Sequence, residues 1–267
     1  MDTSASDVPQ GGIKVQKRQS EILDMVSTKQ RVSVKELACD FEVSEVTIRS
    51  DLDLLEKEGK LKRVRGGAVL PDRMREVADI ARRMEINSEE KRKIAIRANA
   101  LVSDGDSIAV DSGSTSFEFV KTLSNKKELT ILTHDLRMAA YVDRQLPNAS
   151  VIVLGGALRS RHGYCWGPLT VEFINEFFVD KAFLGANAFT PAQGFMTESP
   201  HSGEVKRALI EHSRESIMLI DSFKIGINSF IRFADIGDLD YVVMDDDPDG
   251  IVQQAAGNTS SSPAILK

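Results

Sequence analysis

Hydrophobic positions along the chain follow two different patterns. Up to residue 59 they recur at intervals of three and four, as in Ile48, Leu52 and Leu55, which indicates amphipathic helices. From residue 88 onward, short continuous apolar runs alternate with helical patterns. These patterns predict a helical region near the N-terminus, followed by a larger region in which strands and helices alternate.

Three short helices are predicted in the N-terminal region, in the segments QKRQSEILDMVST, SVKELACDF and SEVTIRSDLDLLEKEG. Ser33 and Ser44 are favourable N-caps, and Glu36 stands at the capping-box spacing from Ser33. Gly59 suits the left-handed position just after a helix. The following KLKRVRGGAVL has a short alternation of apolar and basic residues, a Gly-Gly turn and then apolar residues again, which predicts a small hairpin that ends at Pro71.

Six strands are predicted in the larger region, at 107–111, 129–133, 150–155, 181–186, 216–221 and 240–245. They are almost entirely apolar and are separated by helical segments, so we expect an α/β domain with a mostly parallel sheet covered on both faces. The polar N-terminus and the low-complexity C-terminus are expected to be disordered. The predicted organisation is a disordered tail at 1–14, an α-rich domain at 15–71, a charged linker at 72–90, an α/β domain at 91–252 and a disordered tail at 253–267.

Composition narrows the class of protein. Of the 267 residues, 42% are hydrophobic, which is enough for a core, but no run of about 18 apolar residues is present to cross a membrane. The acidic N-terminal segment lacks the apolar stretch of a secretory signal. Two cysteines, Cys39 and Cys165, are too few for a disulfide framework and are typical of a reducing compartment. We therefore expect a cytoplasmic protein with no membrane partner.

Basic residues are concentrated in one stretch of an otherwise acidic chain. The net charge of the whole chain is −6, yet residues 14–75 contain 14 Lys and Arg against 11 Asp and Glu. An asymmetric basic patch of this kind is a reason to test for binding to nucleic acid. The alternative is a helical protein-interaction module whose basic face is merely solvated.

The third predicted helix has the features of a DNA-recognition helix. With Ile48, Leu52 and Leu55 buried, its N-terminal half presents small polar side chains and an arginine to solvent, which suits the major groove. The hairpin after it would lie against the adjacent DNA backbone, where each cation releases a counterion and makes binding salt-dependent. The residues expected to contact DNA are Ser44, Glu45, Thr47, Arg49 and Ser50 on the helix, and Lys60, Lys62, Arg63 and Arg65 on the hairpin.

This N-terminal segment resembles the winged helix-turn-helix domain of DeoR-type bacterial transcription regulators. The family pattern is approximately V-x-ELA-x-x-F-x-VS-x-x-TIRRDL-x-x-L-x-x-x-G-x-L-x-R-x-HGGA. Matching residues are Val34, Glu36, Leu37, Ala38, Phe41, Val43, Ser44, Thr47, Ile48, Arg49, Asp51, Leu52, Leu55, Gly59, Leu61, Arg63, Gly66, Gly67 and Ala68. Ser50 replaces the usual second arginine, and Arg65 replaces the usual histidine. The resemblance implies a regulator that binds operator DNA.

Polar and glycine residues follow several of the predicted strands. Asp111 and the loop 113–115 come after one of them, and such a loop can offer N–H groups to an anion at the start of a helix. Other candidates are Gly155 and Gly156 after a second strand, Glu204 and Lys206 at a helix start, and Asp221 and Lys224 after a later strand. In a parallel sheet these loops converge beyond the carboxyl ends of the strands, where ligands bind. The alternative is that they are ordinary turns and helix caps.

The larger region resembles the effector domain that accompanies this DNA-binding domain, whose fold is related to ribose-phosphate isomerases. The positions that carry the resemblance are Asp111, Gly113, Ser114, Thr115, Thr133, His134, Gly155, Gly156, Glu204, Lys206, Arg207, Asp221, Lys224 and Gly226. His134 stands in place of the usual asparagine and Ser114 in place of a threonine. The resemblance implies that residues of this set bind a phosphorylated sugar.

The residues and the resemblance together predict a DNA-binding regulator of a sugar or polyol operon, a repressor as the resemblance implies, that is released or modulated by a phosphorylated sugar. No catalytic residue and no cofactor are expected. No metal site is expected either, since the pair His162 and Cys165 lacks a second pair with metal-ligand spacing. A dimer or tetramer is expected because one recognition helix reads few bases. The competing hypothesis is an isomerase-like enzyme that acts on sugar phosphates and carries a DNA-binding appendage.

Overall fold

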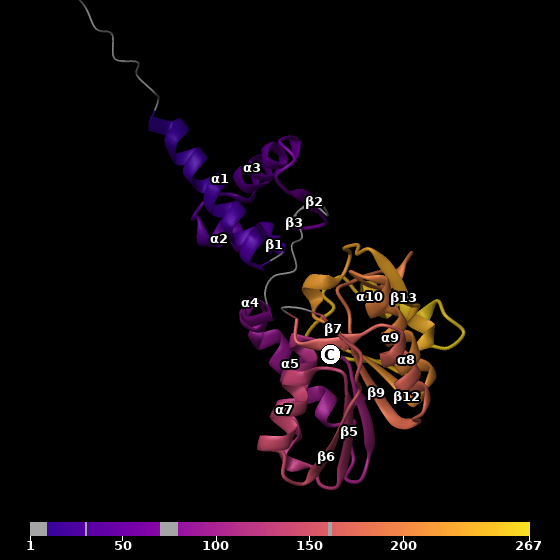
Figure 1. Ribbon diagram of the computed structural model, residues 1–267. Coiled ribbons are helices and arrows are strands. Elements are labelled where there is room, and N and C mark those ends of the chain that lie inside the picture. Colours follow the sequence, from indigo (N-terminus) through magenta and orange to yellow (C-terminus); the bar gives the residue numbers. More distant parts are fainter. Residues whose placement is uncertain (1–9, 30, 70–79, 160–161) are drawn as a thin grey trace, which may run out of the picture. The chain divides into compact units, whose positions relative to one another are not determined.

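The structure, a computed structural model, describes residues 10–29, 31–69, 80–159 and 162–267 (Figure 1). The chain forms two compact units, Met1–Val77 and Ala78–Lys267. Its first helix begins at Gln10, so the expected disorder of residues 1–14 is wrong for residues 10–14. A helix that has nucleated further along extends into preceding residues at little cost, because each added residue gains a hydrogen bond.

The first unit combines three helices with a small antiparallel sheet. The helices are α1 (Gln10–Lys29), α2 (Val34–Asp40) and α3 (Glu45–Lys57), and the strands are β1 (Arg31–Ser33), β2 (Lys62–Val64) and β3 (Gly67–Val69) in the order β1-β3-β2. The predicted hairpin is therefore confirmed as β2 and β3. Strand β1 was not predicted, since three residues are too few to show a period.

Local sequence signals set the ends of these helices. The Ser33 side chain accepts the Glu36 N–H and Glu36 returns a bond to the Ser33 backbone, which confirms the capping box. Ser44 caps α3 by accepting the Thr47 N–H, and Gly59 has a φ of +69°, as predicted for the residue after this helix. The expected stripe of Ile48, Leu52 and Leu55 is buried in the core of the unit.

The second unit is built on a seven-stranded sheet in which all neighbouring strands are parallel, in the order β15-β14-β12-β9-β4-β5-β6. Its strands are β4 (Ser107–Val110), β5 (Leu129–Thr133), β6 (Ala149–Val153), β9 (Val179–Gly185), β12 (Ser213–Leu219), β14 (Tyr241–Val243) and β15 (Ala264–Leu266). The first six of these lie at the six predicted positions, which confirms the α/β fold with a parallel sheet.

Helices cover both faces of this sheet. They are α4 (Ile80–Glu85), α5 (Ser88–Asn99), α6 (Ser114–Lys121), α7 (Leu136–Gln145), α8 (Pro168–Asn175), α9 (Pro200–Glu211) and α10 (Ile251–Gly257). Figure 1 shows α5 and α7 on one side of the sheet and α8 and α9 on the other. One core lies under α5, α6 and α7, and a second lies under α8, α9 and α10.

Several smaller elements were not predicted. They are the hairpin of β7 (Ala157–Arg159) and β8 (Tyr164–Trp166), and the antiparallel sheet of β10 (Ala188–Thr190), β11 (Gly194–Thr197) and β13 (Ile231–Ala234). Of the predicted linker 72–90, residues 72–79 lie outside the described residues, whereas 80–90 contain α4 and the start of α5. The linker prediction is wrong there, because a charged stretch can still form helices that pack along one face.

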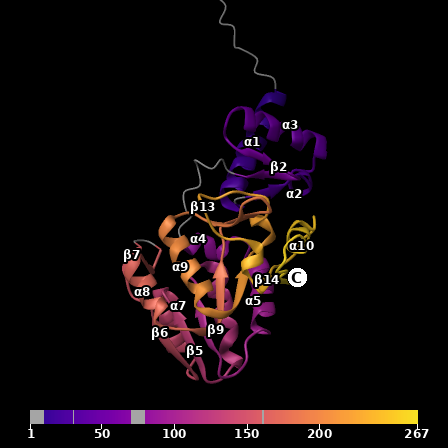
Figure 2. The ribbon, with the colours of Figure 1, turned by 90° about the vertical axis from the view of Figure 1, so that its right-hand side faces the viewer.

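The C-terminal residues are ordered, so the predicted disorder of 253–267 is wrong. Helix α10 buries Val252, Ala255 and Ala256, and β15 pairs in parallel with β14, with Ile265 opposite Val242. Figure 2 shows the C-terminus beside β14. The polar run before β15 suggested disorder, but Ala264–Leu266 complete the edge of the sheet through backbone hydrogen bonds that depend little on side chains.

Candidate DNA-binding surface and effector site

Helix α3 presents its N-terminal half to solvent. Ser44, Arg49, Ser50 and Asp53 are exposed, and Val46 is 72% exposed although it is hydrophobic. Ser44 Oγ lies 2.9 Å from Thr47 Oγ1, so both hydroxyls stand at the positive end of the helix dipole. This arrangement fits a helix that enters the major groove, where base edges would meet small polar groups and an apolar contact.

Arg49 has an internal partner on the same helix. One of its terminal nitrogens lies 2.7 Å from Glu45 Oε2, and both side chains are about half exposed. An exposed pair one helical turn apart is worth only a few tenths of a kcal/mol, so a phosphate or a guanine can displace Glu45 at little cost.

The hairpin of β2 and β3, which is the wing of this domain, does not expose all of its predicted cations to solvent equally. Lys60, Lys62 and Arg65 are exposed, as expected for residues that contact the DNA backbone. Arg63 instead turns back to α3, where it pairs with Asp53 and donates to the Arg49 carbonyl at 3.2 Å. Its backbone N–H also donates to Glu56 Oε1 at 2.6 Å. Arg63 therefore fixes the wing against the recognition helix, a role that the sequence pattern did not reveal.

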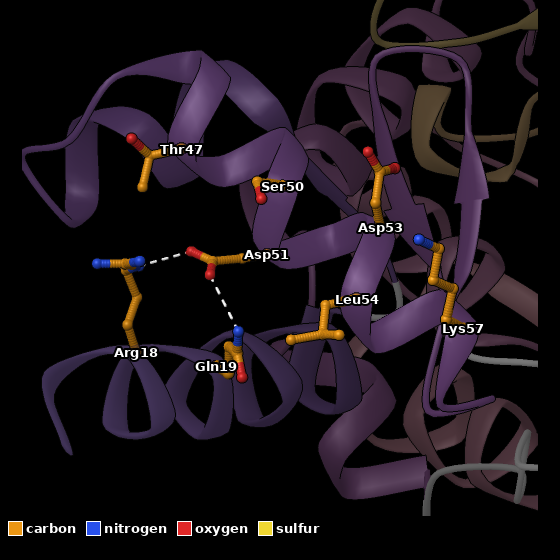
Figure 3. A pocket seen from close by; sticks show the side chains of 8 residues that line it. All are labelled: Arg18, Gln19, Thr47, Ser50, Asp51, Asp53, Leu54 and Lys57. Atoms are coloured by element: carbon orange, nitrogen blue, oxygen red, sulfur yellow. Dashed lines mark hydrogen bonds and ion pairs between the residues drawn. The ribbon is translucent and has the colours of Figure 1, made fainter. Parts of the chain in front are cut away.

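A concave pocket of about 480 Å³ lies between α1 and α3 (Figure 3). At its centre Asp51, only 5% exposed, accepts hydrogen bonds from Arg18 Nε at 2.6 Å and from Gln19 Nε2 at 3.0 Å. The pocket is lined by Arg18, Gln19, Thr47, Ser50, Asp51, Asp53, Leu54 and Lys57. Its two cations and two carboxylates balance, so it is not an anion site; the Asp51 contacts instead fix the angle between α1 and the recognition helix.

In the second unit, three predicted residues form one buried network at the carboxyl end of the sheet. Asp111 follows β4, His134 follows β5 and Lys206 lies on α9, and each is at most 5% exposed. Lys206 Nζ contacts Asp111 Oδ2 and donates to the Gly185 carbonyl at 2.9 Å, and the Gly185 N–H donates to the same carboxylate at 3.0 Å. The Asp111 carboxylate thereby joins the ends of the neighbouring strands β9, β4 and β5 to helix α9.

The histidine of this network has a fixed orientation. Its Nδ1–H donates to the Cys165 carbonyl at 2.6 Å, since a carbonyl can only accept. Nε2 accepts the Ser112 N–H at 3.1 Å and lies 3.2 Å from Asp111 Oδ1. Burial alone would raise the pKa of Asp111, but the neighbouring Lys206 ammonium outweighs the effect of burial, and the pKa is lowered from 3.8 to about 2. Asp111 is therefore ionised.

The loop after Asp111 leads directly into α6. Gly113 precedes the helix with a φ of +154°, which favours glycine, and Ser114, Thr115 and Ser116 are buried in its first turn. Among the described residues no hydrogen bond reaches Ser116 Oγ, which is buried close to Gly113 and Gly185. A helix start with free N–H groups and a spare hydroxyl can bind an anion.

Comparison with known proteins identifies the family. Residues 18–74 match the DeoR-like helix-turn-helix domain, and residues 86–246 match the DeoR C-terminal sensor domain. The chain belongs to the DeoR family. The isomerase hypothesis is thereby set aside: this family member is a DNA-binding transcription regulator and not an enzyme.

Curated relatives of this DeoR-family regulator align over most of their length. The HTH-type transcriptional repressor GlcR of Bacillus subtilis is 30% identical over 84% of this chain and 86% of its own. The glycerol-3-phosphate regulon repressor of Haemophilus influenzae is 32% identical over 88% of this chain and 91% of its own length. The repressor of the same name from Escherichia coli is 31% identical over 91% of this chain and 95% of its own length. A solved ribose 5-phosphate isomerase A from Methanocaldococcus jannaschii has a TM-score of 0.39 and 19% identity over 52% of this chain and 55% of its own, a likeness that assigns no activity.

Other predicted effector residues of this family member lie outside the buried network or serve packing. Thr133 Oγ1 donates to the Val110 carbonyl at 2.8 Å and so ties β5 to β4. A Cβ on Gly156 would lie 2.1 Å from Thr170 Oγ1, so this glycine is required by the start of α8. Glu204 is exposed and lies 3.3 Å from His201.

Within the described ranges, no helix of the regulator is long and apolar enough to span a membrane.

Lys224 and Asp221 form a second charged pair beyond the sheet. Asp221 precedes the short 3-10 helix η3 (Ser222–Lys224) after β12 and Lys224 is its last residue, with Lys224 Nζ 2.9 Å from Asp221 Oδ2. Asp221 is 1% exposed, and in the part of the chain that the structure describes no hydrogen bond reaches its Oδ1. A buried acceptor of this kind is expected to gain a donor when a ligand with hydroxyl groups binds.

Proposed function

We propose that the protein is a transcriptional repressor whose second unit binds a phosphorylated sugar or polyol, and that this binding changes its affinity for operator DNA. The observation that supports it most is the buried network of Asp111, His134 and Lys206 beside the start of α6. Buried charges are costly unless they are paired or serve a ligand, and this group lies where parallel sheets bind ligands.

The chemistry of the site suits a phosphate group joined to hydroxyl groups. The start of α6 offers N–H groups and the helix dipole, and Lys224 adds a cation that is about one-fifth exposed. Asp221 Oδ1 and Ser116 Oγ are buried polar atoms that lack hydrogen bonds within the described residues. A phosphate could be held by the helix start and the cations, while hydroxyl groups donate to the carboxylates.

The N-terminal unit supports operator binding by two copies. A single recognition helix reads few base pairs, so a symmetric dimer or tetramer would be needed to recognise an inverted repeat. Three of the relatives are named as glycerol-3-phosphate regulon repressors, which makes glycerol 3-phosphate a suitable first compound to test.

The proposal is tested in two steps. The protein is first titrated onto labelled DNA from upstream of its own gene, with a scrambled duplex as control, at several salt concentrations. Glycerol 3-phosphate, glucose 6-phosphate and fructose 1-phosphate are then added beside the unphosphorylated compounds, and DNA release and thermal stabilisation are measured. We expect salt-sensitive binding, and release only by a phosphorylated compound.

Two results would count against this function. If every phosphorylated compound left both the melting temperature and DNA binding unchanged, the effector assignment would be rejected. If Lys224→Ala lost DNA binding itself, rather than its response to the compound, the division of roles between the two units would be wrong. Lys93→Ala, an exposed lysine on α5, serves as the matched control.

A further inference from the structure

Strand β6 (Ala149–Val153) forms one edge of the seven-stranded sheet. In the described part of the chain, β5 is the only strand that pairs with it. The Leu154 N–H donates to the Thr133 carbonyl of β5 at 2.9 Å, and the backbone groups of successive residues in a strand point in opposite directions. The N–H and carbonyl groups of Val151 and Val153 therefore point away from the sheet, where another strand could bind them.

The β6 edge lacks the features that keep exposed sheet edges from associating. Residues 145–157 contain no charged side chain, and β6 itself contains no proline and pairs with β5 without a bulge. The opposite edge, β15, has only three residues and is followed directly by Lys267. Proteins commonly shorten an exposed edge or place charge on it to prevent pairing, so a longer edge without charge is suited to a partner strand.

Helix α8 presents an apolar flank toward the same edge. It begins just beyond β6, where Thr170 Oγ1 donates to the Gly155 carbonyl at 2.7 Å, and its Ile174 is buried against the sheet. Helix α9 lies beside α8 on the β9 side (Figure 1), so the other flank of α8 faces β6. In a right-handed helix that runs antiparallel to the strands, this flank carries Leu169 and Phe173, which are 67% and 40% exposed.

Exposed apolar side chains also continue beyond the end of β6. Val153, its last residue, is 40% exposed, and Leu158 on β7 is 58% exposed. A stable dimer buries roughly 800 Å² on each partner, of which a five-residue strand supplies only a part. The flank of α8 and these two side chains add apolar area at the same edge, and a gathering of this kind is typical of a protein interface.

We infer that the β6 edge is the surface on which a second copy of this chain docks, with the two β6 strands antiparallel across a twofold axis. Pairing centred on Val151 would join Val151 to its own copy and Val153 to Ala149, with about four backbone hydrogen bonds. The two sheets then continue into one another, which keeps both α8 helices on one face and covers Leu169 and Phe173.

The absence of charge favours a second copy over a foreign peptide as the partner. In a twofold contact each group near the axis meets the same group of the other copy, so a charged side chain would face its own like, and residues 145–157 contain none. The inference rests on the proposed function in one respect, because operator binding needs two recognition helices. It adds the surface through which the second unit brings two copies together.

The full-length protein is compared with Val151→Pro and with a double variant, Leu169→Glu with Phe173→Glu. Proline at 151 removes an outward N–H without disturbing the bonds to β5, and the double variant leaves β6 unchanged. Ile96→Glu on α5 is the matched control, since Ile96 is an equally apolar side chain with 58% exposure. Light scattering measures the molar mass over a range of concentrations, circular dichroism checks folding, and hydrogen exchange reports on the peptide 148–154.

We expect the wild type and Ile96→Glu to be dimers or larger, and both edge variants to have half that mass, with a dissociation constant raised at least about tenfold. Exchange of 148–154 should be faster in the double variant than in the wild type, while exchange of 263–267 at the other edge stays unchanged.

Two results would overturn the inference while the proposed function stands. One is a wild-type dimer whose mass and exchange at 148–154 are the same in both folded edge variants, since another surface would then join the copies. The other is a wild type that stays monomeric at every concentration and still binds operator DNA. A wild type that dimerises through β6 but responds to no phosphorylated compound would instead reject the effector assignment alone.

Discussion

The buried carboxylate of Asp51 offers a direct test of how the DNA-binding unit is held together. Asp51→Ala removes the acceptor of two hydrogen bonds, from Arg18 at 2.6 Å and from Gln19 at 3.0 Å. The Arg18 and Asp51 side chains are only 16% and 6% exposed, so the guanidinium would be left largely buried without its partner. Both bonds end on a carboxylate, and roughly 1.5 kcal/mol for each, the lower end for a hydrogen bond to a charged group, gives a loss of about 3 kcal/mol.

A loss of this size is a large part of the stability of a small domain. We expect the unfolding transition of the first unit to move down by roughly 15 °C in calorimetry, while that of the second unit stays in place. Asp53→Ala is the matched control: its partner is Arg63, but Asp53 is 58% exposed, so the effect should stay below about 1 kcal/mol. The reasoning is refuted if the two variants destabilise the unit equally. An Arg18→Met, Asp51→Leu double variant should recover part of the loss, because it leaves no unpaired charge.

Four further variants have expected outcomes. Arg49→Ala should cost about 1–3 kcal/mol of operator binding and make the protein less selective among bases. Lys62→Ala should weaken binding to all DNA sequences alike and lower by about one the slope of the logarithm of affinity against the logarithm of salt concentration. Fluorescence anisotropy measures both effects. Asp111 has a lowered pKa, so its contribution of about 2 kcal/mol is present above pH 4 and lost as the pH falls toward 2; Asp111→Asn should abolish this part of the acid-unfolding profile. Deleting 263–267 removes β15 and exposes the edge of β14, which should lower the melting temperature of the second unit without changing operator affinity.

Much of the fold follows from signals that lie within a few residues of each other. The capping serines, the apolar stripe of α3 and the six apolar strand segments each act locally, because a cap or a period is set by neighbours in sequence. The parallel order of strands separated by helices follows from the same alternation. The exposed face of α3 could likewise be predicted, since burial of one stripe determines which residues point outward.

The candidate site was predictable in part. Asp111, His134 and Lys206 come from the ends of two strands and from a helix on the far face, and the convergence of loops at one sheet edge anticipates their meeting. The sequence could not show that Glu204 stays exposed, or that Gly156 must lack a side chain because Thr170 lies against it. Both facts depend on how α8 and α9 pack.

The sequence by itself determined the presence of the three helices and the hairpin of the first unit and of six strands of the sheet, where the first unit concentrates its positive charge, and which motifs make the chain a DeoR-family regulator. Only the tertiary structure decided that Arg18 pairs with Asp51, that β6 is one edge of the sheet and that the last residues form the other edge. The physical reason is the separation along the chain of the residues that interact. Caps and periods involve neighbours along the chain, whereas the pairing of buried charges and the completion of a sheet edge depend on segments that only folding brings together.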